Sequence, residues 1–127
     1  MAAKNRLQPY NVVPAASGNM LSTLQSPPTN ISGLDDVGYS LSWTGTPNGT
    51  FTVQVSLDYS PGLAPTDYPI NAGTWSTLTL STAITASGSP DNAFIDVTLV
   101  SAPWIRLVYT PSSSTGTLSV WVCGKGL

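Results

Sequence analysis

The sequence predicts an all-β protein folded as a single antiparallel β-sandwich, with a jelly roll among the topologies that fit. Apolar and polar residues alternate along several short segments, which is the period of a half-buried strand. Turn residues are frequent, with 11 Gly and 11 Pro among 127 residues. Only 8% of the residues are charged, so the long Lys and Glu side chains that usually cover exposed helices are nearly missing.

Residues 1–36 differ in pattern from the remainder of the chain. Four prolines interrupt this segment, and its apolar residues follow no sustained period of 2 or 3.6. We therefore expect an extended N-terminal arm or cover segment over residues 1–36 and a β-sandwich domain over residues 37–127. Such an arm can add a strand to a neighbouring sheet. Its candidates for contact with a partner are Leu7, Tyr10, Val12 and Val13.

A clear alternation begins at Val37. Residues 37–43 and 51–57 each place their apolar side chains on one face, and Pro47 followed by Asn48 and Gly49 lies between them. Such a sequence is typical of a tight turn, because Asn and Gly adopt positive φ at low steric cost. The two strands are expected to pair as an antiparallel hairpin.

Further short strands are expected after a loop rich in Pro and Gly over residues 58–74. They cover residues 75–80, 94–100, 104–110 and 117–123. In the last strand, alternation places Leu118, Val120 and Val122 inside and Trp121 outside. Six or seven strands, separated by turns about every ten residues, are typical of a sandwich.

The composition argues against several partners. The chain has four Lys and Arg residues and a net charge of −2, too few dispersed cations to bind a phosphate backbone, so we expect no nucleic acid partner. No run of 18 apolar residues predicts a membrane span. Cys123 is the single cysteine, and residues 1–10 contain no apolar signal segment, so we expect synthesis in a reducing cytoplasm.

Catalytic groups are scarce. The chain contains no His and no Glu, which removes the usual base of nucleophilic hydrolysis and the common zinc ligand sets. Six Asp residues could supply the carboxylate pair of a glycosidase, but turn capping and solvation explain their positions more simply. Asp91 with Asn92, or Asp35 with Asp36, lacks the spacing of a calcium loop. We expect no catalytic, metal or cofactor site, and therefore no enzyme.

The four tryptophans divide into two expected groups. Trp43 and Trp75 are predicted to fill the core. By alternation, Trp104 and Trp121 point away from it, and two outward tryptophans indicate a covered surface. The cover could be the arm, another subunit or a glycan. Arg106, the one charge in its strand, is expected to form an ion pair with an Asp or to lie exposed.

Several strand and turn motifs resemble a known group of proteins. They are the run from Trp43 to Ser56, then Gly73-Thr74-Trp75, then Ala102-Pro103-Trp104-Ile105-Arg106-Leu107, and finally Gly116-Thr117-Leu118. Over about residues 37–126 the chain is similar to the small β-sandwich structural proteins of tailed bacteriophage virions, in particular capsid cement (decoration) proteins. The resemblance implies a small protein without catalytic residues. It also implies binding over seams between subunits of the major capsid protein, as a homodimer or homotrimer.

The expected function is therefore that of a non-enzymatic structural protein on the exterior of a phage capsid, made in the host cytoplasm. A head-completion, neck or tail protein is an alternative within the same particle. A carbohydrate-binding or receptor-binding module that uses Trp104 or Trp121 is an alternative of another class. The two tryptophans complete the set of candidates for partner contact.

Overall fold

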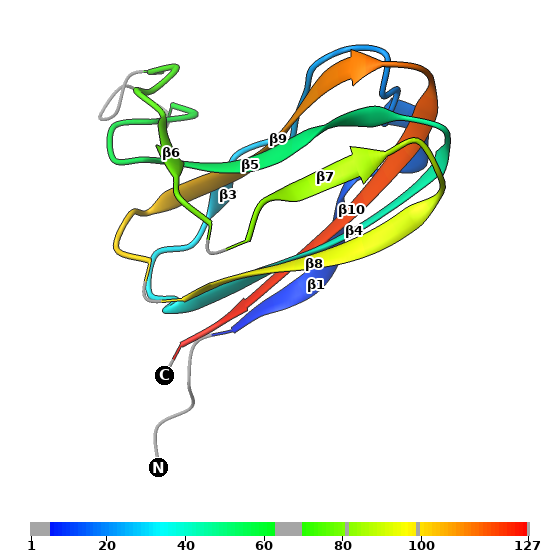
Figure 1. Ribbon diagram of the computed structural model, residues 1–127. Coiled ribbons are helices and arrows are strands. Elements are labelled where there is room, and N and C mark those ends of the chain that lie inside the picture. The colour runs from blue at the N-terminus through cyan, green and yellow to red at the C-terminus, as the bar shows by residue number, and fades with distance from the viewer. Residues whose placement is uncertain (1–5, 63–69, 81, 99, 127) are drawn as a thin grey trace.

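Figure 1 shows the computed structural model, which describes residues 6–62, 70–80, 82–98 and 100–126. Two antiparallel sheets pack face to face, which confirms the predicted all-β sandwich. The first sheet has the order β1 (Arg6–Val13), β10 (Gly116–Lys125), β4 (Asp36–Gly45) and β8 (Asp91–Thr98). The second sheet is centred on β9 (Trp104–Ser113) and β5 (Asn48–Ser56). β2 (Leu24–Gln25) and β3 (Thr29–Asn30) pair with β9, and β6 (Ser76–Leu78) and β7 (Ile84–Ser87) pair with β5.

The order of the strands is that of a jelly roll. If β2 with β3, and β6 with β7, are each taken as one interrupted strand, the two sheets have the orders 1-8-3-6 and 2-7-4-5. Apart from the interrupted strands, only the step from β5 to β6 stays within one sheet in the described part of the chain. Most connections therefore cross between the sheets at the ends of the sandwich.

The predicted hairpin between residues 37–43 and 51–57 is wrong. β4 pairs with β10 and β8, whereas β5 pairs with β9, β6 and β7. The chain leaves the first sheet at Gly45. The φ of Gly45 is 83°, and a Cβ at this position would lie 2.7 Å from the carbonyl oxygen of Thr115. Both features favour glycine. Alternation determines which side chains face inward, but not which strand lies alongside, and β4 and β5 face each other across the core.

Residues 6–36 contribute to both sheets, which differs from the expected division at residue 36. β1 pairs with β10, and β2 and β3 pair with β9. Five apolar side chains of this segment are buried in the common core, namely Val12, Val13, Met20, Ile31 and Leu34. Their spacing is irregular because the β1 pairing contains two register shifts and because the chain then changes sheet. The segment is extended, but its described part belongs to the sandwich.

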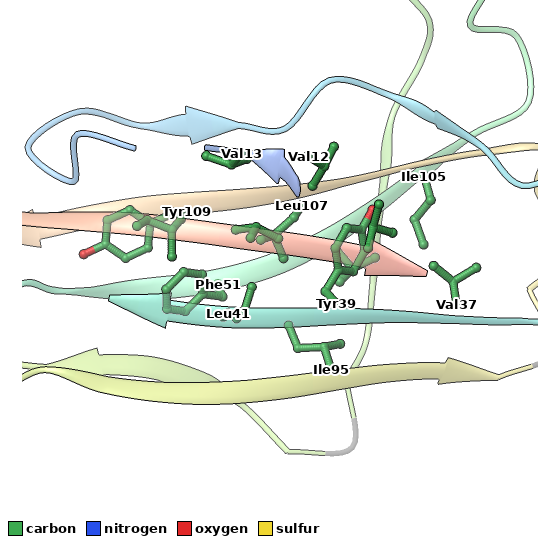
Figure 2. Close-up of a cluster of buried hydrophobic side chains, with 14 of the residues drawn as sticks. Val12, Val13, Val37, Tyr39, Leu41, Phe51, Ile95, Ile105, Leu107 and Tyr109 are labelled. Atoms are coloured by element: carbon green, nitrogen blue, oxygen red, sulfur yellow. The ribbon is translucent and has the colours of Figure 1, made fainter. Parts of the chain in front are cut away.

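The core fills the space between the two sheets (Figure 2). Side chains of β4, β9 and β10 converge there, and the alternation of β10 is as predicted, since Leu118, Val120 and Val122 are at most 1% exposed. Phe51 packs against Trp43 and Tyr109, with ring centroids 5.2 Å and 4.8 Å apart. Trp43 is thus a core residue, as the sequence predicts.

The two long sides of the sandwich differ. On one side, the hydroxyls of Tyr10 in β1 and Thr29 in β3 share a hydrogen bond of 3.1 Å, which joins the edges of the two sheets. On the other side, an open groove of about 550 Å³ separates β8 from the segment that contains the end of β6 and the start of β7. The apolar residues that line the groove are Leu78, Leu80 and Ile84 on one side and Phe94, Ile95 and Val97 on the other.

Two buried tyrosines generate a prediction about alkaline stability. The hydroxyls of Tyr39 and Tyr109 are buried; that of Tyr109 has no hydrogen-bond partner among the described residues, whereas that of Tyr39 lies close to the Ser26 hydroxyl. Burial raises the pKa of both phenols above the ordinary value of 10.0. Above about pH 10 the unfolded chain therefore releases protons that the folded chain retains. The free energy of unfolding should be constant below that pH and fall above it, by at most about 1.4 kcal/mol per pH unit for each tyrosine.

Urea titrations between pH 7 and pH 11 measure this dependence. Tyr109→Phe should remove part of the alkaline loss and, at pH 7, leave stability unchanged or raise it by about 1 kcal/mol, because an unpaired buried hydroxyl is lost. Tyr10→Phe is the matched control, since it breaks the bond to Thr29 and should lower stability by about 1 kcal/mol. A Tyr109→Phe protein as destabilised as the control would contradict the assignment.

Candidate interaction surface

The six candidates for partner contact differ in exposure. Val12 and Val13 are each 6% exposed and hold the sheets together, so they are not available at the surface. Leu7 is half-buried against the core, and Tyr10 is 40% exposed with its hydroxyl bonded to Thr29. Trp104 is half-buried and Trp121 is 49% exposed. Trp121 therefore offers the largest uncovered ring of the six.

Trp121 shares one row of the first sheet with a second exposed aromatic residue. Strand pairing places Trp121 opposite Ser40 of β4, and Ser40 opposite Phe94 of β8. Residues directly opposite each other in antiparallel strands point to the same face. Phe94 is 58% exposed. We call the outer face of the first sheet around Trp121, Ser40 and Phe94 the aromatic face.

The Phe94 ring lies over Gly38 of β4. A Cβ at Gly38 would come within 2.5 Å of Phe94 Cζ, so a larger residue there would displace the ring. Gly38 is paired with Cys123 of β10, and all three residues line a depression of about 630 Å³ that extends across the first sheet to β1. The aromatic face is therefore a shallow surface with little side-chain bulk beside the Phe94 ring.

Polar groups border the aromatic face on both ends. At one end, strand pairing aligns Arg6, Lys125 and Asp36, and Asp96 lies one row closer to the rings. At the other end, the outward positions carry hydroxyl or amide side chains, which are Ser42, Thr44, Asn92, Thr117 and Ser119. A partner that binds the aromatic face would therefore contact uncharged rings in the middle and charges of both signs at one end only.

Trp104 is covered by its own chain. The Tyr59 ring centroid lies 4.8 Å from that of Trp104, edge to face, and 5.7 Å from that of Trp75. The Cζ atom of Arg106 lies 4.2 Å from the centroid of Trp75, within the range of a cation–π interaction. These four side chains form what we call the covered cluster, on the second sheet. Trp75 is half-buried in this cluster, so its predicted place in the core is wrong.

The Arg106 guanidinium is half-buried and held by neutral groups, so it neither pairs with an Asp among its hydrogen-bond partners nor lies exposed, the two alternatives expected from the sequence. Its Nε donates to Oε1 of Gln54 at 2.9 Å, and its Nη1 lies 3.4 Å from Oε1 of Gln25. Burial lowers the pKa of Arg106, although a guanidinium remains protonated at neutral pH. Arg106 therefore links three strands of the second sheet and stacks on Trp75.

Asp58 fixes the segment that covers Trp104. Its carboxylate accepts hydrogen bonds from the Thr74 backbone N–H at 2.6 Å, the Ser56 hydroxyl at 2.9 Å and the Thr74 hydroxyl at 3.0 Å. These bonds, the Thr74 N–H first, hold the pKa of Asp58 below its ordinary value. Backbone bonds between Ser60 and Asn71 close the same segment. The role of Asp58 is the turn capping that the sequence predicts.

Within the described residues, no three side chains of the types His, Cys, Asp or Glu come together as metal ligands. Asp91 accepts a hydrogen bond from the Asn92 N–H at 2.8 Å, again a local turn contact. Asp67 lies outside the described residues. No helix in the described part of the chain has the length and apolar character needed to cross a membrane.

The chain matches no protein-family model and no curated protein.

Two aromatic residues of these surfaces were not identified as candidates from the sequence. Phe94 could have been found, because it precedes the inward Ile95 and so must point outward. Tyr59 carries no such signal, since it lies beyond the end of β5 and acts only once Asp58 and Thr74 fold the chain back.

The covered cluster predicts a role for the Tyr59 ring. Tyr59→Ala should expose Trp75 and Trp104 and lower stability by about 1–3 kcal/mol, because two aromatic contacts are lost. Limited proteolysis should then cleave faster within residues 57–62 and 70–74, and tryptophan fluorescence should shift to longer wavelength. Tyr59→Phe keeps both ring contacts and should behave as the wild type. Equal cleavage rates for the Ala variant and the wild type would show that the cluster does not hold this segment.

Proposed function

We propose that this chain is a non-enzymatic structural protein of a tailed-phage virion, a capsid cement protein that binds the major capsid protein from the exterior of the head. The observation that carries the proposal is the aromatic face, where Trp121 and Phe94 are 49% and 58% exposed on a four-stranded sheet. The placement in a phage particle rests on the resemblance of the strand and turn motifs.

The composition of the aromatic face supports a protein partner. Interface centres are poor in charge and rich in aromatic residues, and tryptophan is among the side chains that contribute most to binding. Ser40, which lies between the two rings in the same row, is small, so a partner side chain could reach the sheet there. The hydroxyl groups around the rings can exchange hydrogen bonds with a partner backbone without the desolvation cost of charged groups.

A cement protein acts by mass action. If the chain binds the assembled lattice and not the free capsid subunit, each bound copy stabilises the lattice in proportion to its occupancy. Contacts with two or more subunits at a seam add avidity, so modest individual contacts suffice. This role requires no reacting group, and the rigid sandwich only has to present the aromatic face.

Carbohydrate binding is a second candidate that the same surface supports. Aromatic rings beside hydroxyl side chains can stack on sugar rings and hydrogen-bond to them, and jelly rolls occur in lectins as well as in capsids. The fold therefore does not choose between the two functions. They differ in the partner that the rings must contact.

Rebinding of purified protein to phage heads stripped of it tests the proposal. Trp121→Ala and Phe94→Ala should each weaken binding to the heads by about 30-fold or more, the loss expected when a central aromatic anchor is removed. The wild-type protein should also raise the temperature at which the heads release DNA. Leu57→Ala is the matched control, because Leu57 is 78% exposed and lies away from the aromatic face, just after the end of β5 of the second sheet. This variant should bind as the wild type does.

Other outcomes would reject the proposal. Wild-type protein that rebinds without stabilising the heads would not be cement. Binding to isolated tails or necks instead of heads would favour the alternative within the particle. If a glycan array gives binding that Trp121→Ala abolishes while attachment to heads persists, the aromatic face is a sugar site.

A further inference from the structure

The four edges of the two sheets differ in their protection against strand addition. β1 contains Pro9 and two register shifts. β2 and β3 have two residues each and are separated by two prolines, and β6 and β7 have three and four residues. Prolines, bulges and short strands are the usual means by which proteins prevent another chain from pairing with a sheet edge. Three of the four edges are thus blocked.

The fourth edge, β8, has none of these features. Its eight residues contain no proline and pair with β4 one by one from Asp91 to Thr98 without a register shift. Figure 1 shows β8 at the edge of the first sheet, and no described strand pairs with its outer side. The Phe94 ring leans over Gly38, away from this edge. A further strand could therefore bond to the backbone of β8.

We propose that β8 pairs with β8 of a second copy of this chain, antiparallel about a two-fold axis at Phe94. The first sheets of the two copies then form one continuous sheet of eight strands. In this register Phe94 lies opposite Phe94 of the second copy, and Asn92 lies opposite Asp96. On the inner face, Ala93 lies opposite Ile95. The dimer is a property of the chain itself and does not rest on the proposed function.

This register makes β8 complementary to itself. The Asn92 amide can donate to the Asp96 carboxylate of the second copy, and the symmetry repeats the contact, so no like charges lie opposite each other. The two Phe94 residues lie opposite each other at the axis, each with its ring over Gly38 of its own copy, and the small Ala93 accommodates the larger Ile95. An axis at Ile95 instead would place each Phe94 ring opposite an Asp96 carboxylate, and an axis at Ala93 would leave Asp96 without the amide of Asn92 opposite it. The dimer also joins the two aromatic faces into one surface.

Charge variants at Asn92 test the register in solution by sedimentation equilibrium. Asn92→Asp puts a carboxylate opposite Asp96 twice and should weaken dimerisation by about tenfold, whereas Asn92→Lys creates two opposite-charge pairs and should strengthen it. Asn92 is exposed, so neither change disturbs the core. Thr117→Asp is the matched control, since it adds the same charge to an exposed position of the same face on β10 and should leave dimerisation unchanged.

A wild-type chain that remains monomeric at millimolar concentration would overturn the proposal. So would Asn92→Asp and Asn92→Lys variants that change dimerisation in the same direction.

Disulfide trapping provides a second measurement that does not depend on the strength of association. In a Cys123→Ser background, Phe94→Cys should form a cross-linked dimer under mild oxidation. Opposite residues of antiparallel strands have Cα atoms about 4.5–5.5 Å apart, which suits a disulfide. Thr98→Cys should not cross-link, because the two copies of residue 98 would be about 27 Å apart along the strands. Equal cross-linking at both positions, or none at residue 94, would contradict this pairing.

Discussion

Phe51 of β5 packs between Trp43 of β4 and Tyr109 of β9, and this contact joins the two sheets where the chain crosses from β4 to β5. The Trp43 indole N–H also donates to the Ser89 carbonyl at 3.0 Å, and the Gly88 N–H donates to the Pro47 carbonyl at 2.8 Å. The connection from β4 to β5 and the connection from β7 to β8 are therefore held together beside the Trp43 ring. If β4 slipped by one residue, Trp43 would point outward. Every other side chain of β4 would also move to the opposite face of the first sheet. The aromatic face depends on this contact.

The alternation of apolar residues predicted the orientation of side chains but not the pairing of strands. It correctly placed Val120 inside and Trp121 outside, because inward or outward direction is a local property of each strand. It failed for β4 and β5, because pairing depends on which distant strand lies nearest. β10, more than 70 residues along the chain, occupies the position beside β4 that a hairpin partner would take. The irregular residues 6–36 were misread for the same reason, since bulges and a change of sheet conceal their inward faces.

The candidate surface was predictable to a similar extent. Alternation placed both Trp104 and Trp121 on outer faces, but it could not distinguish a ring that the chain covers itself from one that it leaves open. That difference depends on Asp58, which accepts three hydrogen bonds from residues up to 16 positions away and so brings Tyr59 and Trp75 together. No comparable segment covers Trp121 in the described part of the chain. Trp104 therefore stabilises the second sheet, whereas Trp121 still offers apolar area to a partner.

The positions of the few cations make the two ends of the aromatic face different. Arg106 is engaged by Gln54, Gln25 and the Trp75 ring. Arg6 and Lys125 lie together with Asp36 at one end of the aromatic face. Charges at the rim of an interface affect orientation and association rate more than they affect strength. On this surface, the uncharged rings would provide the affinity and the charged end would orient the partner, so binding should depend only weakly on salt.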